Sequence, residues 1–195
     1  MNKFHFVLSV ALACGASACS NVPVAMRADI TTIPIDQHLS GMSVAVSKVR
    51  DLRPDRATLG KHRDGIARVT QYEYAPAGDV GGYVKKLAEL TMLARGARLT
   101  PASEADVRVE IDILAIDLTT DGALAGEETF GSVQMAFRFL DQDDKLIGEK
   151  VVKRPFRNEE LDDRGLVGDA LKDAVLSAVA RIHPRQGRPD VAAAR

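Results

Sequence analysis

The chain has 195 residues, 46% hydrophobic and 27% charged, with a formal net charge of −1. A chain of this length forms about one domain, and its core is large enough to need no disulfide or metal. Nucleic acids are bound through clustered Lys and Arg and through stacking on aromatic rings, so the near-neutral charge and the aromatic content of 5% exclude them as expected partners.

Residues 1–18 have the layout of a secretory signal peptide. Lys3 precedes an apolar run from Phe4 to Ala13, and small residues follow. A run of about ten residues is too short to cross roughly 30 Å of hydrocarbon as a helix. We therefore predict a signal peptide over residues 1–18 and no permanent transmembrane helix.

The sequence before Cys19 resembles the lipobox of bacterial lipoproteins, in which the Cys is acylated and becomes the first mature residue. The three preceding residues are Ala-Ser-Ala, whereas the favoured lipobox has Leu three places upstream. We predict lipid attachment at Cys19, with Cys14 as the competing site. Ordinary cleavage after Ala18, leaving a free thiol, is the remaining alternative.

Acyl chains on Cys19 would hold the protein firmly in a membrane, because each buried methylene contributes about 0.8 kcal/mol. Ser20 follows the Cys, and this resembles lipoproteins that are transferred to the outer membrane. The expected location is the periplasmic face of the bacterial outer membrane. Both cysteines of the chain lie in this leader region, so the body has no disulfide, thiolate metal site or Cys nucleophile.

The first part of the mature chain reads as a tether followed by a strand. Residues 19–40 contain Pro23 and Pro34 among polar residues, and the β-rich stretch 28–33 predicts one edge strand. Residues 41–49 alternate between larger apolar and small side chains, which predicts a strand. The single folded domain is expected to cover residues 41–184.

A charged loop and a helix come next. Residues 50–65 are dense in charge and contain Pro54 and Gly60, which predicts a loop, and residues 66–74 follow as a short strand. Apolar residues recur at helical spacing from Asp79, a capping residue, to Arg95, and Gly96 is placed to end this helix.

The second half predicts a β-meander and a last helix. Residues 107–113 alternate strictly, and the apolar residues then change parity, which predicts a bulge or a second buried face. Residues 133–139 and 145–152 form two more strands, and Asp141–Asp144 suits a tight turn between them. Apolar residues at helical spacing continue from Leu166 to Ile182, with Pro184 as the stop and 185–195 as a disordered tail.

The order of these elements predicts an α+β fold. Neighbouring strands are joined by short turns, and the helices precede and follow the meander instead of alternating with its strands. We therefore expect a mostly antiparallel sheet with two helices packed on one face.

The chain resembles the YajG family of bacterial lipoproteins over roughly residues 41–182. The resemblance rests on an acyl-Cys signal followed by Gly41, Val44, Val46, Ser47 and Lys48, the run 49–53, Leu59-Gly60-Lys61, Leu93-Ala94-Arg95-Gly96 and Ala105-Asp106. It implies an α+β periplasmic domain of uncharacterised function, and it supplies no functional residues. The weak lipobox departs from the family's Leu-rich one.

The loop 50–65 is the place where acids, bases and a His gather. It predicts either a partner-binding surface or a solvated loop of balanced charges, and an acid–base site with His62 as base is a weaker reading because no nucleophile motif accompanies it. The candidate binding residues are Asp51, Arg53, Asp55, Arg56, Lys61 and His62.

Known site patterns are missing elsewhere in the sequence. The histidines are scattered without metal-ligand spacing, and residues 141–144 lack the central Gly and the Glu at the twelfth position of a calcium loop. Gly81-Gly82 lies inside a predicted helix without a phosphate-loop context. We therefore expect no cofactor and no metal.

The sequence favours a non-catalytic envelope lipoprotein that acts as an interaction or accessory module. The alternatives are a small-ligand carrier, which needs an apolar pocket of at least about 300 Å³, and a periplasmic hydrolase with an unrecognised site. The partner and the oligomeric state do not follow from the sequence.

Overall fold

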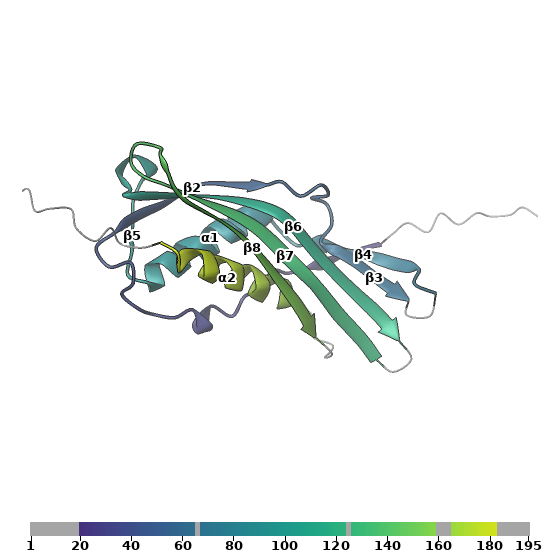
Figure 1. Ribbon diagram of the computed structural model, residues 1–195. Coiled ribbons are helices and arrows are strands. Elements are labelled where there is room, and N and C mark those ends of the chain that lie inside the picture. The colour runs from purple at the N-terminus through teal and green to yellow at the C-terminus, as the bar shows by residue number, and fades with distance from the viewer. Residues whose placement is uncertain (1–19, 65–66, 124–125, 159–164, 183–195) are drawn as a thin grey trace, which may run out of the picture.

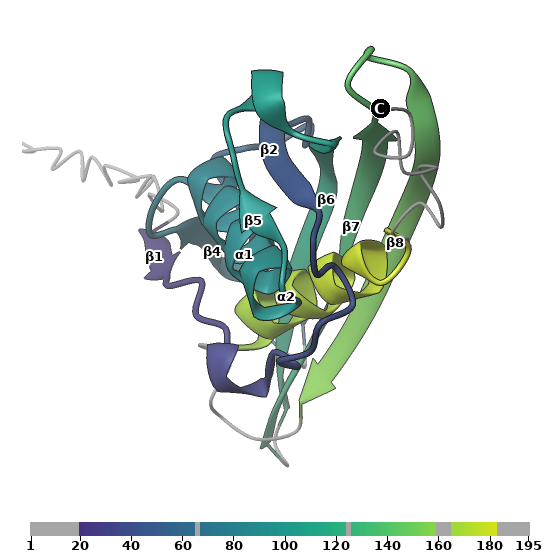
Figure 2. The same ribbon diagram turned by 90° about the vertical axis from the view of Figure 1, so that its left-hand side faces the viewer.

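A computed structural model describes residues 20–64, 67–123, 126–158 and 165–182. Within these ranges eight strands form one sheet, and both α-helices lie against the same face of it (Figures 1 and 2). The predicted α+β fold with two helices on one face of the sheet is confirmed. The signal peptide, Cys14, Cys19, Pro184 and the tail 185–195 lie outside the described residues.

The three longest strands form the predicted antiparallel meander: β6 (Val107–Ala123), β7 (Gly126–Leu140) and β8 (Leu146–Asn158). The turn between β7 and β8 is the expected one. The Asp141 carboxylate accepts hydrogen bonds from the backbone N–H of Asp143 and of Lys145, each at 3.0 Å. Asp144 adopts φ +61°, a left-handed conformation that Asp tolerates in turns.

The other edge of β6 is shared by two shorter strands that run parallel to it. β2 (Ser43–Asp51) pairs with the first half of β6, and β3 (Gly60–Asp64) pairs with the second half. The loop between β2 and β3 therefore lies beside the middle of β6. Further strands flank each of them, which makes the sheet mixed, with the most extensive pairs antiparallel. The shorter strands are β1 (Ser20–Val24), β2 (Ser43–Asp51), β3 (Gly60–Asp64), β4 (Thr70–Pro76) and β5 (Arg98–Leu99).

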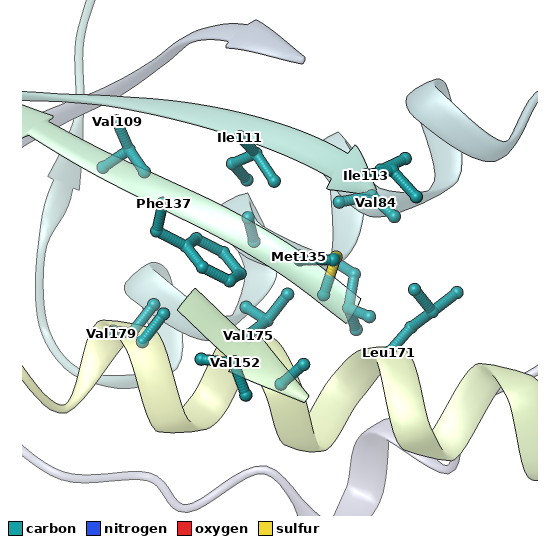
Figure 3. Packing of buried hydrophobic residues seen from close by; sticks show 14 of the residues in the cluster. Val84, Val109, Ile111, Ile113, Met135, Phe137, Val152, Leu171, Val175 and Val179 are labelled. Carbon is teal, nitrogen blue, oxygen red and sulfur yellow. The ribbon is translucent and has the colours of Figure 1, made fainter. Parts of the chain in front are cut away.

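The core lies between the helices and the sheet face built from the alternating residues of β6 and β7 (Figure 3). The predicted change of parity in β6 is a bulge, because the pairing with β7 shifts between Ile113 and Ala115. Beyond the bulge Ile116 and Leu118 are buried in their turn. The buried residues of the two strands are Val107, Val109, Ile111, Ile113, Ile116, Leu118, Val133, Met135, Phe137 and Phe139.

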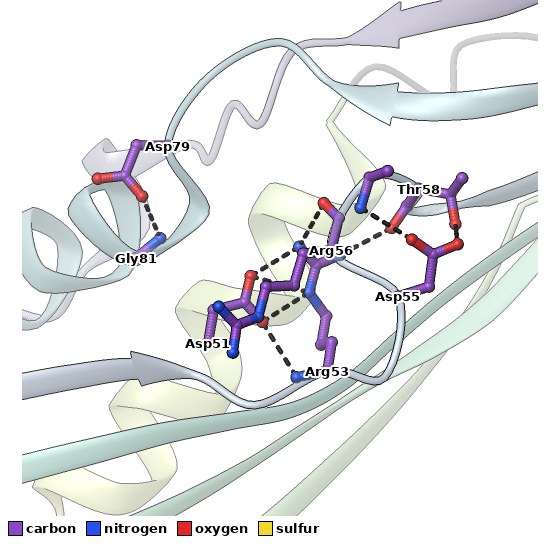
Figure 4. Close-up of polar contacts among 8 residues, drawn as sticks. Asp51, Arg53, Asp55, Arg56, Thr58, Asp79 and Gly81 are labelled. Atoms are coloured by element: carbon purple, nitrogen blue, oxygen red, sulfur yellow. Dashed lines mark hydrogen bonds and ion pairs between the residues drawn. The ribbon is translucent and has the colours of Figure 1, made fainter.

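Both helices begin and end close to the predicted positions. The Asp79 carboxylate accepts a hydrogen bond from the Gly81 N–H at 3.0 Å and caps α1 (Val80–Ala94), as Figure 4 shows. Gly96 adopts φ +84° immediately after the helix, the left-handed conformation that ends many helices. α2 (Leu166–Val179) packs on β7, β8 and α1.

The predicted edge strand at residues 28–33 is wrong. This stretch contains the 3₁₀ helix η1 (Ile30–Thr32), and the N-terminal strand is β1, which pairs with β4. The Asp29 carboxylate accepts from the Thr31 N–H and hydroxyl, and such local bonds compete with strand pairing.

Residues 25–42, predicted as a tether up to residue 40, cross the outer side of the helices, and we call this segment the strap. The buried Lys172 of α2 donates hydrogen bonds to the Asp29 carbonyl at 3.1 Å and to Thr32 Oγ1 at 2.7 Å. Ile33 and Leu39 are buried in the same core as the helices. The strap therefore packs with the domain and closes one side of the core.

Candidate functional site

The candidate residues near residue 53 form a loop held by one guanidinium (Figure 4). Arg53 is only 4% exposed. Its guanidinium donates to both carboxylate oxygens of Asp51, to the Thr58 carbonyl at 2.8 Å and to the Arg56 carbonyl at 3.3 Å. Arg53 therefore holds residues 52–59 in one conformation and offers no free cation to a partner.

The carboxylates of this loop are also used internally. Burial would raise the pKa of Asp51, but hydrogen bonds from the Arg53 side chain and backbone outweigh it and hold that pKa below its ordinary value. Hydrogen bonds from the Thr58 hydroxyl and the Ala57 N–H lower the pKa of Asp55. Both groups are therefore anions at neutral pH, and their charges are already compensated within the loop.

The continuous loop predicted over residues 50–65 is wrong, because residues 60–64 form β3. Lys61 and His62 lie in that strand, whereas Asp51 ends β2 and Arg53 to Arg56 lie in the loop. The two groups of candidate residues thus occupy different places along β6. Charge density alone does not separate a short loop from a polar strand.

His62 lies on the helix-bearing face of the sheet, beyond the helices. It is opposite Tyr72 of β4 and Thr120 of β6 in the strand register, and its ring stacks on that of Tyr72 with centroids 4.5 Å apart. The side chain is buried, and its Nε2 is 3.5 Å from a Glu127 carboxylate oxygen. Among the described residues neither ring nitrogen has a hydrogen-bond partner.

A row of hydroxyl groups continues from this histidine across the sheet. The Tyr74 hydroxyl donates to Thr120 Oγ1 at 2.8 Å, and Thr120 and Thr129 share a hydrogen bond of 3.0 Å. Sequence reasoning missed this row. The alternating Tyr72 and Tyr74 were its only local signal.

A hollow of about 470 Å³ opens beside these side chains. It is lined by residues 22–25 and Arg27, by Tyr72 and Tyr74 of the neighbouring strand β4, and by Glu127. The side chains of residues 22–25 are apolar, and the others include two phenol rings and a carboxylate. The hollow is thus large enough for a small amphiphilic molecule.

The free edge of β8 is a second candidate surface. In the described part of the chain β8 pairs only with β7, and its first half exposes Leu146, Ile147 and Val151 to 50%, 44% and 55%. A shallower hollow of about 580 Å³ lies near the other end of the strand, lined by Phe130, Pro155 and Phe156 among others.

The inner side of β8 is positively charged. The pKa of Lys150 is lowered mainly by burial, and further by the positive charges of Arg181 and Arg154. The Lys150 ammonium donates to the Ser177 carbonyl at 2.6 Å and to its hydroxyl at 2.8 Å, near the end of α2. The sequence analysis did not single out this strand as a site, although its four basic residues were visible.

The described ranges contain no helix long and apolar enough to cross a membrane. They also contain no group of three His, Cys, Asp or Glu side chains that could hold a metal ion. His38, one of the scattered histidines, places its Nε2 2.8 Å from the Ile182 carbonyl oxygen.

No family model matches the chain, and no curated protein matches it in sequence. The resemblance to the YajG family therefore stays a prediction.

Several solved structures are similar to this chain. Protein XCC0632 from Xanthomonas campestris, of family model DUF330, is 11% identical with a TM-score of 0.52 over 80% of this chain and 89% of that one. The PelC dodecamer from Paraburkholderia phytofirmans is 11% identical, with a TM-score of 0.40 over 70% and 89%. A minor lipoprotein from Acinetobacter baumannii is also 11% identical, with a TM-score of 0.37 over 70% and 90%. At 11% identity the likeness to XCC0632 shows the fold alone, and the two lower TM-scores support no conclusion.

Proposed function

We propose that this protein is a lipoprotein of the bacterial outer membrane, similar to the YajG family, that is anchored through an acylated Cys19 and faces the periplasm. Its domain binds another envelope protein and catalyses no reaction. The observation that carries the binding role is the free edge of β8, with three exposed apolar side chains on one strand. The Ala-Ser-Ala-Cys sequence supports the anchor.

The β8 edge suits an extended partner segment. A strand that adds to a free sheet edge gains backbone hydrogen bonds, and side-chain contacts supply its specificity. Pairing with a partner strand is interrupted at Pro155, because proline has no backbone N–H to donate. The inward-pointing Lys150 is a feature that limits pairing of the β8 edge with other, unrelated strands. The docking stretch is therefore Leu146–Arg154.

The charge of the edge indicates the chemistry of the partner. Lys153 and Arg154 lie on this stretch with a single acid, Glu149, whereas Lys150 is bound to Ser177. We expect an extended segment that carries both apolar and acidic residues. The charged loop at residues 51–58 is a weaker docking site, because its arginine and carboxylates are bound to one another.

Site-specific photo-crosslinking in intact cells tests the docking role. A photoreactive residue at Val151 should yield an adduct of discrete mass, whereas one at Lys86, exposed on α1, should not. Lys153→Glu combined with Arg154→Glu should weaken the Val151 adduct, and Arg56→Glu should leave it unchanged. Equal adducts from positions 151 and 86 would contradict docking at β8.

Mass spectrometry of the mature N-terminus tests the anchor. An acylated Cys19 is expected, and an unmodified Cys19 or a mature chain that starts at Cys14 would contradict the assignment. Turnover of a periplasmic substrate that is lost in His62→Ala would contradict the non-catalytic role.

A small-ligand carrier is the second candidate, and the hollow beside Tyr72 favours it. Native mass spectrometry of the purified protein would then show a bound small molecule. Tyr72→Ala should lose that molecule, whereas the Val151 adduct should persist.

A further inference from the structure

The chain enters the folded domain at the first residue after the proposed anchor. Ser20 is already in β1 and pairs with Tyr72 of β4, and the two strands run parallel. The N-terminal end of β1 therefore lies at the same end of the sheet as the start of β4 at Thr70. One residue of extended chain spans about 3.3 Å, so an acyl group on Cys19 has almost no spacer between the lipid and the sheet.

The strand ends near Ser20 define one end of the molecule, which we call the anchor end. β3 finishes at Asp64 opposite Gly122, and β6 finishes at Ala123 opposite Gly126 of β7. Figure 1 shows these strand ends together at one end of the molecule and the β7–β8 turn at the opposite end. A bilayer that holds Cys19 must therefore lie next to the anchor end.

The strand register shows how far the anchor end projects. Ser20 is paired with Tyr72, Tyr72 with His62, and His62 with Thr120, so Thr120 of β6 lies at the same level of the sheet as Ser20. β6 continues beyond this level for three residues, to Ala123. At about 3.3 Å per residue this is roughly 10 Å, or about 7 Å beyond the level of Cys19. The headgroup layer on each side of a bilayer is roughly 5–8 Å thick, so the end of β6 would reach into it.

The side chains at the anchor end suit that layer. Val69, just before β4, is 60% exposed, and the exposed Arg68 beside it adopts φ +52°. Acids and bases are mixed there, with Arg63 and Arg68 alongside Asp64 and Glu127. A mixed surface of this kind fits zwitterionic headgroups better than a strongly anionic membrane.

We propose, on the basis of the lipid anchor proposed above, that the anchor end is a membrane-contact surface that rests in the headgroup layer of a zwitterionic bilayer. The hollow lined by residues 22–25 and Tyr72 then begins close to the membrane surface, because Tyr72 is level with Ser20, and it is within reach of lipid-derived amphiphiles. β7 starts at the anchor end and spans 15 residues, about 50 Å at this rise. Leu146 pairs with Leu140, the last residue of β7, so it lies at the end of the molecule far from the membrane.

Fluorescence quenching on vesicles tests this orientation. The mature lipoprotein has no cysteine besides the acylated Cys19, so Val69→Cys and Leu146→Cys each introduce one thiol for a dye. The acylated proteins are reconstituted in phosphatidylethanolamine–phosphatidylcholine vesicles that contain a headgroup-attached quencher. The dye at position 69 should lose most of its emission, whereas the dye at position 146 should lose none.

A spacer variant is the matched control. Fifteen Gly and Ser residues inserted between Cys19 and Ser20 have a root-mean-square length of about 21 Å, and they should restore the emission at position 69 while the protein stays on the vesicles. An acylated protein with equal quenching at both positions, or with no effect of the spacer, would overturn this inference and leave the anchor intact. An unacylated Cys19 would overturn both proposals.

Discussion

Replacing Arg53 by Leu is expected to destabilise the domain strongly although the residue lies in a short charged loop. The substitution leaves the Asp51 carboxylate, whose side chain is 18% exposed, without its ion-pair partner, and it leaves the Thr58 carbonyl without its donor. Breaking a buried pair from one side costs about 3–5 kcal/mol. Because Asp51 keeps some access to water, we expect about 3 kcal/mol, or a fall in Tm of about 6–12 °C.

Arg56→Leu is the matched control, because Arg56 is exposed, its only hydrogen bond in the network is made by its backbone carbonyl, and its side chain acts on Asp51 through charge alone. Its cost should stay within about 0.5 kcal/mol. This result would distinguish the two arginines, both of which the sequence predicts as candidate binding residues. Urea unfolding followed by circular dichroism measures both variants, and an unchanged slope with urea would show that only stability has changed.

The effect of Arg53 should depend on pH in a defined direction. Hydrogen bonds from Arg53 lower the pKa of Asp51 in the folded state, so this contribution is complete above the unfolded pKa of about 3.9. It is lost as the pH falls through the lower folded pKa. The gap between wild type and Arg53→Leu should therefore be constant near pH 7 and narrow in strong acid. An Arg53→Leu protein as stable as wild type at pH 7 would refute the reasoning.

Four further substitutions test the packing. Ile111→Asp places a carboxylate at a site that is 1% exposed and should lower the free energy of unfolding by more than about 4 kcal/mol. The measurement is the yield of soluble folded protein, which should be lost. A folded mutant with an unchanged melting temperature would contradict the assignment of Ile111 to the buried face of β6. Lys172→Met removes the bonds to Asp29 and Thr32 and should lower the free energy of unfolding by about 1–3 kcal/mol. Amide hydrogen exchange should become faster at Thr31 but not in β7. An equal increase in exchange at both places would argue against a strap held by this lysine. Gly60→Ala would place a Cβ 1.7 Å from the Leu118 carbonyl oxygen and should prevent folding. Gly41→Ala is the control: Gly41 has φ +81° and open space around it, so this variant should lose only about 1–2 kcal/mol of stability. Similar melting temperatures of the two variants would refute the close approach of β3 to β6.

The strands that are predicted well are those whose signal is local. In β6 the alternation and its change of parity are written in consecutive residues, so both the buried face and the bulge at Ile113 could be predicted. The capping Asp79 and the terminal Gly96 define α1 in the same way. Each of these signals works because its physical cause involves only near neighbours in the chain.

The features that were missed depend on partners distant in sequence. Residues 28–33 look β-rich, but Lys172, some 140 residues away, holds this stretch against α2. His62 reads as a loop residue until β3 is aligned with β6 and β4, which places it against Tyr72 and Thr120. Arg53 was missed for another reason. Its acceptors, the Asp51 carboxylate and the carbonyls of Arg56 and Thr58, are near in sequence, but a charged loop gives no sign of which of its arginines is buried.

The strap also bears on the order in which the chain folds. Its bonds join Asp29 to Asp169 and His38 to Ile182, so the first segment of the domain cannot complete its contacts until the last helix is present. Contacts of such high sequence separation form late, because the closure of a long loop has to precede them. Under the export and acylation proposed above, residues 25–42 would therefore remain undocked until α2 has crossed the inner membrane. The proposed acylation of Cys19 would then act on a chain that has not completed its fold, and docking of α2 would end that period.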